Sequence, residues 1–230
     1  MEYDVVYILK NDIDPSELRY SLRSLENFPH GKVWFFGGAP EGIKPDRQVI
    51  IRQHGASKWE KVRNTIRTVC ETDEVSSSFW LFNDDFFCMK PCGYFPPIFN
   101  GTLYSRIVEI EDRAKAMTPY SLQLRKTAEL LDSKDMDVLN YAVHLPMLID
   151  KQRALVVLDE FKTCPMFRSL YGNSCGIGGL LHKDVKIYDP TEEPDPDEFW
   201  LSTTNESFSK GKAGEYIRKQ FQKECVYELG

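Results

Sequence analysis

Two adjacent carboxylates follow a run of large apolar residues in the first half of the chain. In the segment "FWLFNDDFFCMKP", Phe79–Pro91, the polar residues Asn83, Asp84 and Asp85 separate two aromatic runs. Because an unpaired charge between buried segments is costly, these acids require a partner. Paired carboxylates at a strand end suit a hard divalent cation that also binds phosphates, so we expect Mg²⁺ or Mn²⁺ here. The alternative is a turn, which Asn-Asp-Asp also begins well.

Basic residues gather in two stretches that precede these acids. They are Arg19, Arg23, Lys58, Arg63 and Arg67. Two arginine pairs have the four-residue spacing that places like charges on one helix face, where they repel slightly. A bound anion facing the helices would explain why like charges share a face. Arginine guanidinium groups match the geometry of phosphate, so a diphosphate is one such anion. The alternative is a helix surface exposed to solvent. The chain has no P-loop and no G-x-G-x-x-G motif, so a nucleoside triphosphatase or a dinucleotide dehydrogenase is not supported.

One further candidate is His144, which is followed by Pro146 in an apolar stretch. We expect this stretch to be helical. A lone histidine in such a stretch is more often structural than catalytic. His144 alone is therefore not sufficient to indicate a catalytic site.

The elements that would position these residues alternate along the first half of the chain. Asp14, Pro15 and Glu17 form a helix start with a cap, a first-turn proline and a capping-box acid. We expect strands at Tyr3–Leu9, Lys32–Gly38, Arg47–Ile51 and the opening run, and helices after Asp14 and over Ser57–Glu71. This order predicts an α/β fold with a mostly parallel central sheet.

Ligands bind beyond the carboxyl ends of the strands in such sheets. Asn11 and Asp12 follow the first strand, and Asn83–Asp85 follow the opening run. We therefore expect these residues to share one site.

The second half of the chain is less regular, with helices and many loops. We expect a connection over Gly93–Gly101, helices over Leu103–Ala116, Pro119–Leu131 and Gly214–Cys225, and a small-residue loop over Gly172–Leu181. The segment Glu198–Phe208 repeats the pattern of an apolar run followed by polar residues, here Asn205 and Glu206. We interpret residues 1–230 as one domain with two halves, residues 1–92 and residues 93–230.

The composition fits a globular enzyme without a global basic field. Apolar residues make up 42% of the 230 residues, and the formal charge is −6, which does not favour nucleic-acid binding. No apolar run reaches the ~18 residues that span a bilayer, and the start of the chain does not resemble a signal peptide. The six cysteines form no C-x-x-C pair, so we expect reduced thiols and a cytoplasmic protein.

The order of four segments resembles the Stealth family of sugar-phosphate transferases, which act on nucleotide sugars. The segments are "LRYSLRSL" (Leu18–Leu25), "FWLFNDDFF" (Phe79–Phe87), "HLP" (His144–Pro146) and "FRS" (Phe167–Ser169). The resemblance spans roughly residues 4 to 208 and implies a GT-A-like, Rossmann-type nucleotide-sugar domain. It implies a nucleotide-sugar-binding half over residues 1–92 and an acceptor and catalytic half over residues 93–230. The chain departs from the family in opening with "VYILKND" and in lacking the long insertions of larger members.

The resemblance also implies roles for individual residues. Arg19, Arg23 and Arg168 would contact phosphates, Asp84 and Asp85 would lie at the nucleotide-sugar centre, and His144 would be catalytic. The family's late Asn-Asp motif would fall on Asn205 and Glu206, where glutamate replaces aspartate. Asp85 and Glu206 are thus the expected metal ligands. The remaining expected contacts to the donor come from Asn11, Asp12, Lys58, Arg63, Asn64 and Asn83.

These observations lead us to expect a metal-dependent glycosyltransferase that uses a nucleotide diphosphate sugar, such as a UDP-sugar, and modifies an acceptor hydroxyl. The acceptor would be a saccharide, a polyol-phosphate or a modified nucleobase. Three alternatives stay open. They are a Stealth-type hexose-1-phosphate transferase acting on a polysaccharide, a phage enzyme that glycosylates modified DNA bases, and a non-catalytic nucleotide-sugar-binding protein.

Overall fold

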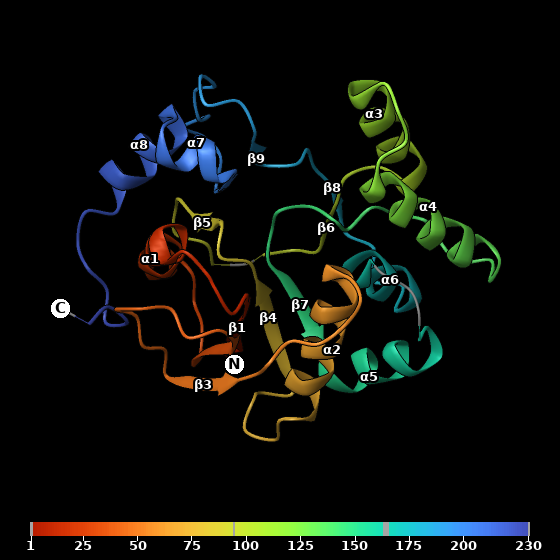
Figure 1. Ribbon diagram of the computed structural model, residues 1–230, viewed down its shortest axis with the longest axis horizontal. Helices are drawn as coiled ribbons and strands as arrows, with labels where there is room; N and C mark the ends of the chain where they lie inside the picture. The colour runs from red at the N-terminus through yellow and green to blue at the C-terminus, as the bar shows by residue number, and fades with distance from the viewer. Residues whose placement is uncertain (1, 94, 163–165, 230) are drawn as a thin grey trace.

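A five-stranded mixed sheet forms the centre of the molecule (Figure 1). The computed structural model describes residues 2–93, 95–162 and 166–229. The strand order is β3-β2-β1-β4-β7, and all neighbours are parallel except β4 and β7. The strands are β1 Asp4–Leu9, β2 Val33–Gly37, β3 Arg47–Ile50, β4 Ser78–Phe82 and β7 Met147–Asp150. The expected α/β class with a mostly parallel sheet is confirmed.

One face of the sheet is covered by α1 (Pro15–Ser24), which continues into a short 3₁₀ helix, η1 (Leu25–Asn27). Asp14 caps α1 by accepting a hydrogen bond from the Ser16 backbone N–H, and Pro15 opens the first turn. Leu18 and Leu22 then bury their side chains against the sheet, as their helical spacing predicts. The expected role of Glu17 as a capping-box acid is wrong, because its carboxylate accepts a hydrogen bond from Thr203 instead.

The opposite face is covered by α2 (Lys58–Glu71) and α5 (Lys151–Glu160). Ser57 caps α2 by accepting a hydrogen bond from the Glu60 backbone N–H. Ile66 and Val69 of α2 are buried in the cluster that also contains Phe79 of β4. Alternate residues of β4 point to opposite faces of the sheet. Phe79 and Leu81 pack on this face, and Trp80 and Phe82 pack on the face that α1 covers.

The second half of the chain adds two further groups of elements. The first contains α3 (Leu103–Ala114), α4 (Pro119–Asp132), α6 (Phe167–Ser174) and the parallel pair β6 (Ile98–Phe99) and β8 (Leu180–Leu181). The second is a small sheet in the order β5-β10-β9 with the helices α7 and α8 beside it (Figure 1). Its elements are β5 Phe86–Cys88, β9 Lys186–Ile187, β10 Trp200–Thr203, α7 Asn205–Ser209 and α8 Lys212–Gln220.

Several expected boundaries differ from the structure. His144 does not lie in a helix, because residues 141–146 are irregular and lead into strand β7. The start of the expected loop at Gly172 belongs to α6, and the last helix ends at Gln220 rather than Cys225. Pro146 lacks an amide hydrogen and disfavours a helical residue before it, which explains the irregular approach to β7.

Among the described helices, none combines the length and the apolar composition that crossing a bilayer requires. Four of the described cysteines have free thiols: Cys70, Cys88, Cys175 and Cys225. Cys164 lies outside the described residues.

Candidate functional site

A cavity of about 580 Å³ opens at the carboxyl ends of β1 and β4. This is the edge at which an α/β sheet binds its ligands. The cavity brings together six of the residues expected at the site, from four separate segments of the chain. They are Asn11, Asp12, Lys58, Asn83, Asp84 and Arg168.

Two glycines allow the ends of β1 and β2 to approach closely beside this cavity. A Cβ atom on Gly37 would lie 2.1 Å from the Leu9 carbonyl oxygen, and one on Gly38 would lie 2.0 Å from the Lys10 carbonyl oxygen. Gly37 also has a φ of +116°, which side chains rarely adopt. Without side chains at these two positions, the backbone after β2 can lie against the backbone at the end of β1. Lys10, Asn11 and Asp12, which follow β1, line the cavity.

Cationic side chains outnumber carboxylates in the wall of the cavity. The cations are Lys10, Lys58, Lys61 and Arg168, and the carboxylates are Asp12 and Asp84. The Lys58 ammonium lies 5.0 Å from the centroid of the Trp59 ring, which also lines the cavity. A wall with excess positive charge and an indole ring suits an anionic ligand that carries a planar ring.

Arg168 at the start of α6 joins the end of β4 to the segment that carries His144. Its guanidinium donates to the carbonyl oxygens of Leu145 at 2.7 Å and Leu81 at 3.1 Å, and to Asn83 Oδ1 at 3.2 Å. Burial lowers the pKa of Arg168 to about 10, although the Asp85 carboxylate opposes this effect. Arg168 therefore holds Asn83 in the cavity wall, besides lining the cavity itself.

Asp84 and Asp85 point to different places. Asp84 lines the cavity, whereas Asp85 is 9% exposed and accepts hydrogen bonds at Oδ2 from Lys186 Nζ at 2.6 Å and Ser202 Oγ at 3.1 Å. The other carboxylate oxygen, Asp85 Oδ1, is buried without a hydrogen-bond partner among the described residues. Burial, and then the Asp85 charge, raises the pKa of Asp84. Asp84 thus lies at the cavity wall, whereas Asp85, the expected metal ligand, turns Oδ2 toward residues of the small sheet.

A third acid, Glu17 of α1, lies behind this pair. It is 8% exposed and accepts a hydrogen bond from Thr203 Oγ1 at 2.8 Å. Burial raises the pKa of Glu17 to about 7, with smaller contributions from the charges of Asp85 and Asp84.

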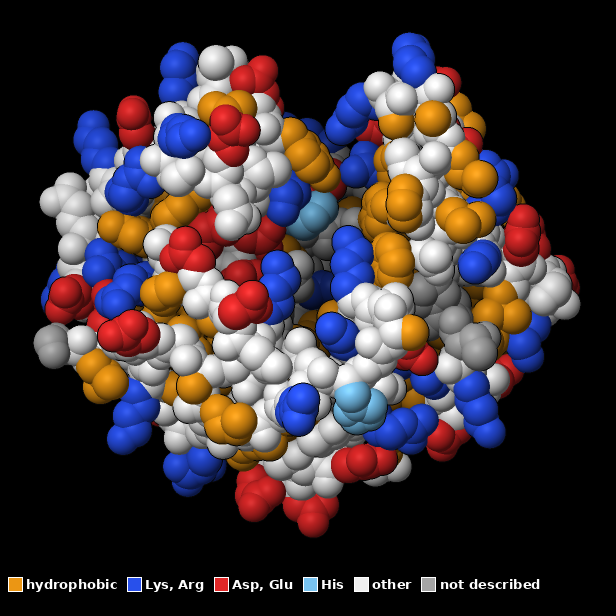
Figure 2. Space-filling view, in the orientation of Figure 1, with side chains coloured by type: hydrophobic (Ala, Val, Ile, Leu, Met, Phe, Trp, Pro, Cys, Tyr) orange, Lys and Arg blue, Asp and Glu red, His pale blue; other side chains and the backbone are white. Residues whose placement is uncertain are grey.

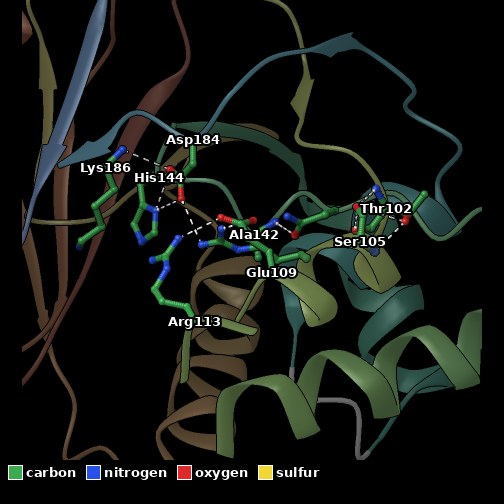
Figure 3. Close-up of polar contacts among 10 residues, drawn as sticks. Thr102, Ser105, Glu109, Arg113, Ala142, His144, Asp184 and Lys186 are labelled. Atoms are coloured by element: carbon green, nitrogen blue, oxygen red, sulfur yellow. Dashed lines mark hydrogen bonds and ion pairs between the residues drawn. The ribbon is translucent and has the colours of Figure 1, made fainter. Parts of the chain in front are cut away.

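His144 forms a pair with Asp184, which precedes β9. The imidazole Nδ1 lies 2.9 Å from each carboxylate oxygen of Asp184 (Figure 3). The Arg106 guanidinium lies 3.7 Å from Asp184 Oδ2. Burial opposes ionisation of Asp184, but the hydrogen bonds and charge of His144 and Arg106 outweigh it and lower the pKa of Asp184. A proton on Nδ1 that is donated to Asp184 leaves Nε2 as the basic nitrogen.

Neighbouring residues of the segment before β7 line different cavities. Val143 and Leu145 line a second, aromatic cavity of about 670 Å³, whereas His144 points to Asp184 and Ala142 lines the first cavity. His144 is not among the residues that line either cavity. Arg168 lies in the walls of both.

Arg19 and Arg23 of α1 do not line the first cavity. Arg23 donates to Glu228 from Nε at 2.7 Å and to the Phe221 carbonyl oxygen at 2.9 Å, and Arg19 lies 3.2 Å from Glu228. Glu228 therefore supplies the anion that their spacing suggested. The expected phosphate contact is corrected to an ion pair with the C-terminal segment.

Three further expected residues also lie elsewhere. Arg63 donates to the Leu158 carbonyl oxygen of α5, and Asn64 donates to the His54 carbonyl oxygen at 3.2 Å. Glu206 lies exposed in the first turn of α7. The described part of the chain contains no group of three His, Cys, Asp or Glu side chains placed to hold a metal ion, so Glu206 does not complete the expected ligand set.

The sequence-based reasoning missed Asp184 and Lys186, which bind His144 and Asp85. A signal for them exists in "LHKDVKIYD", where His182, Asp184 and Lys186 alternate with other residues. Alternation of this kind indicates a strand with one polar face, but it does not reveal which residues that face meets.

Figure 2 shows that the face in view is hollowed between the α7–α8 region and the α3–α4 region, with Lys and Arg side chains around the hollow. No protein-family model matches the chain, and no curated protein matches it either.

Proposed function

We propose that the protein is a GT-A-like transferase that binds a nucleotide diphosphate sugar in the cavity at the ends of β1 and β4. The observation that carries this proposal is the convergence of six expected residues from four segments on one cavity of about 580 Å³. That volume lies in the usual range for small-molecule sites. The Stealth-like order of segments supports the same class of donor.

The charge distribution of the cavity supports a diphosphate ligand. Lys58 lies in the first turn of α2, where the helix dipole also favours an anion. Lys10 and Arg168 contribute charge from the ends of β1 and α6. Trp59 offers its ring to the base or the sugar, and Asn11, Asp12 and Asn83 offer polar contacts to hydroxyl groups.

The residues present also fit a divalent cation beside the diphosphate. Asp84 lines the cavity, and Asp85 Oδ1, which is buried without a hydrogen-bond partner among the described residues, would be the second hard oxygen. Two protein oxygens are sufficient for Mg²⁺ or Mn²⁺ where substrate phosphates supply further ligands. When bound, the cation would neutralise the diphosphate and favour departure of the nucleotide.

His144 supplies the general base in this proposal. With Nδ1 held by Asp184, Nε2 would take the proton from an acceptor hydroxyl. In glycosyl transfer the acceptor oxygen bonds to the anomeric carbon, the bond from that carbon to the phosphate oxygen breaks, and a nucleoside diphosphate leaves. In sugar-phosphate transfer, which the Stealth resemblance favours, the oxygen attacks the β-phosphorus, the bond to the bridging oxygen breaks, and a nucleoside monophosphate leaves.

The acceptor would be a saccharide, a polyol-phosphate or a modified nucleobase. A net charge of −6 weighs against a DNA duplex as acceptor.

A donor screen tests the proposal. UDP-, GDP-, CMP- and TDP-sugars are added with Mg²⁺ or Mn²⁺, and the thermal melting temperature is measured. We expect at least one donor to raise it, and Asp84→Asn to remove most of that rise. Asp73→Asn, which changes an exposed carboxylate outside the cavity, is the matched control. If no nucleotide sugar stabilises the wild-type protein with metal, the proposal is contradicted.

A further inference from the structure

A lysine already occupies one side of the buried carboxylate pair. Lys186 reaches Asp85 from β9, with Nζ 2.6 Å from Oδ2. The side chains are only 14% and 12% exposed, so solvent screens this ion pair weakly. Ser202 Oγ adds a hydrogen bond to the same oxygen. Asp85 is thus neutralised within the protein.

Lys186 interacts electrostatically with more than one carboxylate. Glu17 of α1 and Asp84 also lie within its electrostatic reach, and Lys186 lowers the pKa values of both against the raising effect of burial. Lys10, which directly follows β1, also lowers the pKa of Asp84, and the Asp85 charge raises the pKa of Arg168 in α6. Lys186 is the cation among these that makes direct contact with the pair.

We propose that Lys186 is a built-in counter-ion that prevents the carboxylate pair from binding a divalent cation before the donor is present. This inference rests on the proposed function and specifies the order of binding at that site. The metal ion would enter with the diphosphate of the donor.

The Lys186 ammonium changes how many carboxylates of the pair are available to a metal ion. With Lys186 in place, Asp84 is the carboxylate of the pair that has no direct cationic partner shown among the described residues, and Asp85 offers Oδ1 alone. One unneutralised carboxylate holds Mg²⁺ or Mn²⁺ weakly, because these ions give up their water reluctantly and need further oxygen ligands. The donor's phosphates supply these ligands. Removal of Lys186 would leave two neighbouring carboxylates and strengthen metal binding without nucleotide.

The test is Mn²⁺ binding, followed by electron paramagnetic resonance of the free ion, with and without UDP, and with GDP in parallel. For wild type we expect binding at least about tenfold tighter with nucleotide than without. Lys186→Met should bind Mn²⁺ at least about tenfold tighter than wild type without nucleotide, since a factor of ten corresponds to about 1.4 kcal/mol. Lys186→Arg keeps the charge and should behave as wild type. Lys183→Met, which removes an exposed lysine of the same segment, is the matched control.

The direction of the change separates this role from a structural one. Damage to the site would weaken Mn²⁺ binding, whereas loss of a counter-ion strengthens it. The inference is overturned if Lys186→Met gains no affinity for Mn²⁺ without nucleotide, or if wild type binds Mn²⁺ equally well in both conditions.

A second variant covers the case in which Lys186→Met does not fold because Asp85 is left as an unpaired buried charge. The double change Asp85→Asn with Lys186→Met removes both charges and should fold, with Mn²⁺ affinity no higher than wild type. Tighter Mn²⁺ binding by this double variant would overturn the inference. Calorimetry with UDP and GDP distinguishes the two proposals: absence of nucleotide binding by wild type contradicts the proposed function, whereas nucleotide binding with the wrong Mn²⁺ behaviour contradicts the counter-ion role alone.

Discussion

His144 and Asp184 are forty residues apart in sequence, and their contact defines which imidazole nitrogen can act as a base. Both carboxylate oxygens of Asp184 lie 2.9 Å from Nδ1, and the Arg106 guanidinium lies 3.7 Å from Oδ2 of the same carboxylate. The geometry is that of a base oriented by an acid, which general-base catalysis requires.

At this residue scale, His144→Ala should lower the transfer rate by about 10²- to 10⁴-fold, the usual contribution of a general base. Asp184→Asn should lower kcat less, with little change in KM for the donor, because it disturbs the tautomer and leaves the donor cavity intact. The measurement is steady-state transfer or donor hydrolysis. His182→Ala, which changes a partly exposed histidine on the same segment as Asp184, serves as the control. Equal rates for wild type and His144→Ala would contradict the assignment.

Glu17 gives a second prediction at the residue scale. Its pKa of about 7 lies above the ordinary value of 4.5, so the folded state favours the neutral acid. The folded protein is therefore destabilised as the pH rises from about 4.5 through 7, and the loss is complete above 7.

The variant Glu17→Gln should remove this loss and stabilise the protein by up to about 3 kcal/mol at pH 8, with no gain at pH 4. Urea unfolding at both pH values measures it. Glu26→Gln, an exposed position just after α1, should change stability little at either pH. A gain that is the same at both pH values would show that ionisation of Glu17 is not its cause.

At the scale of elements, the C-terminal segment is fixed to α1 and to the loop before β3. Glu228 accepts hydrogen bonds from Arg19 and Arg23, and the backbone N–H of Leu229 donates to the Gly42 carbonyl oxygen. The Glu228 side chain is 1% exposed. Its burial opposes ionisation, but the hydrogen bonds from Arg23 and the backbone outweigh this and lower the pKa of Glu228 to about 2.

A lowered acid pKa stabilises the folded state above the ordinary value of 4.5, and this contribution is lost as the pH falls through 2. Glu228→Gln should therefore lower the free energy of unfolding by about 2 kcal/mol at pH 7, with a smaller difference at pH 3. Denaturant unfolding at the two pH values measures this. Glu224→Gln, an exposed position in the same segment, is the control and should have little effect. An undiminished difference at pH 3 would contradict the ion-pair explanation.

The central elements could be predicted from sequence because their signals are local. The apolar run before Asn83 forms β4, and Asp14 with Pro15 opens α1 as their types predict. Helical spacing, however, did not show what Arg19 and Arg23 face, because their partner Glu228 lies about two hundred residues away. Local patterns thus specify the elements better than the partners of their polar side chains.

At the scale of the whole molecule, the rule that ligands bind at the carboxyl ends of parallel strands located the cavity. It brought Asn11, Asp12 and Asp84 together correctly. The rule could not show that Asp85 turns toward Lys186, or that Asp184 approaches His144. Those contacts depend on the position of β9 beside β10, which is a long-range feature of the fold.

We propose that this cavity binds a nucleotide sugar and that His144 assists its turnover. The most direct test is mass spectrometry of the nucleotide released from the donor that stabilises the protein most, with metal present. We predict that wild type and His182→Ala release a nucleoside diphosphate or monophosphate, and that His144→Ala releases it at least about 10²-fold more slowly. A wild-type protein that binds the donor and leaves it intact, both with and without a hydroxyl acceptor, would contradict the account.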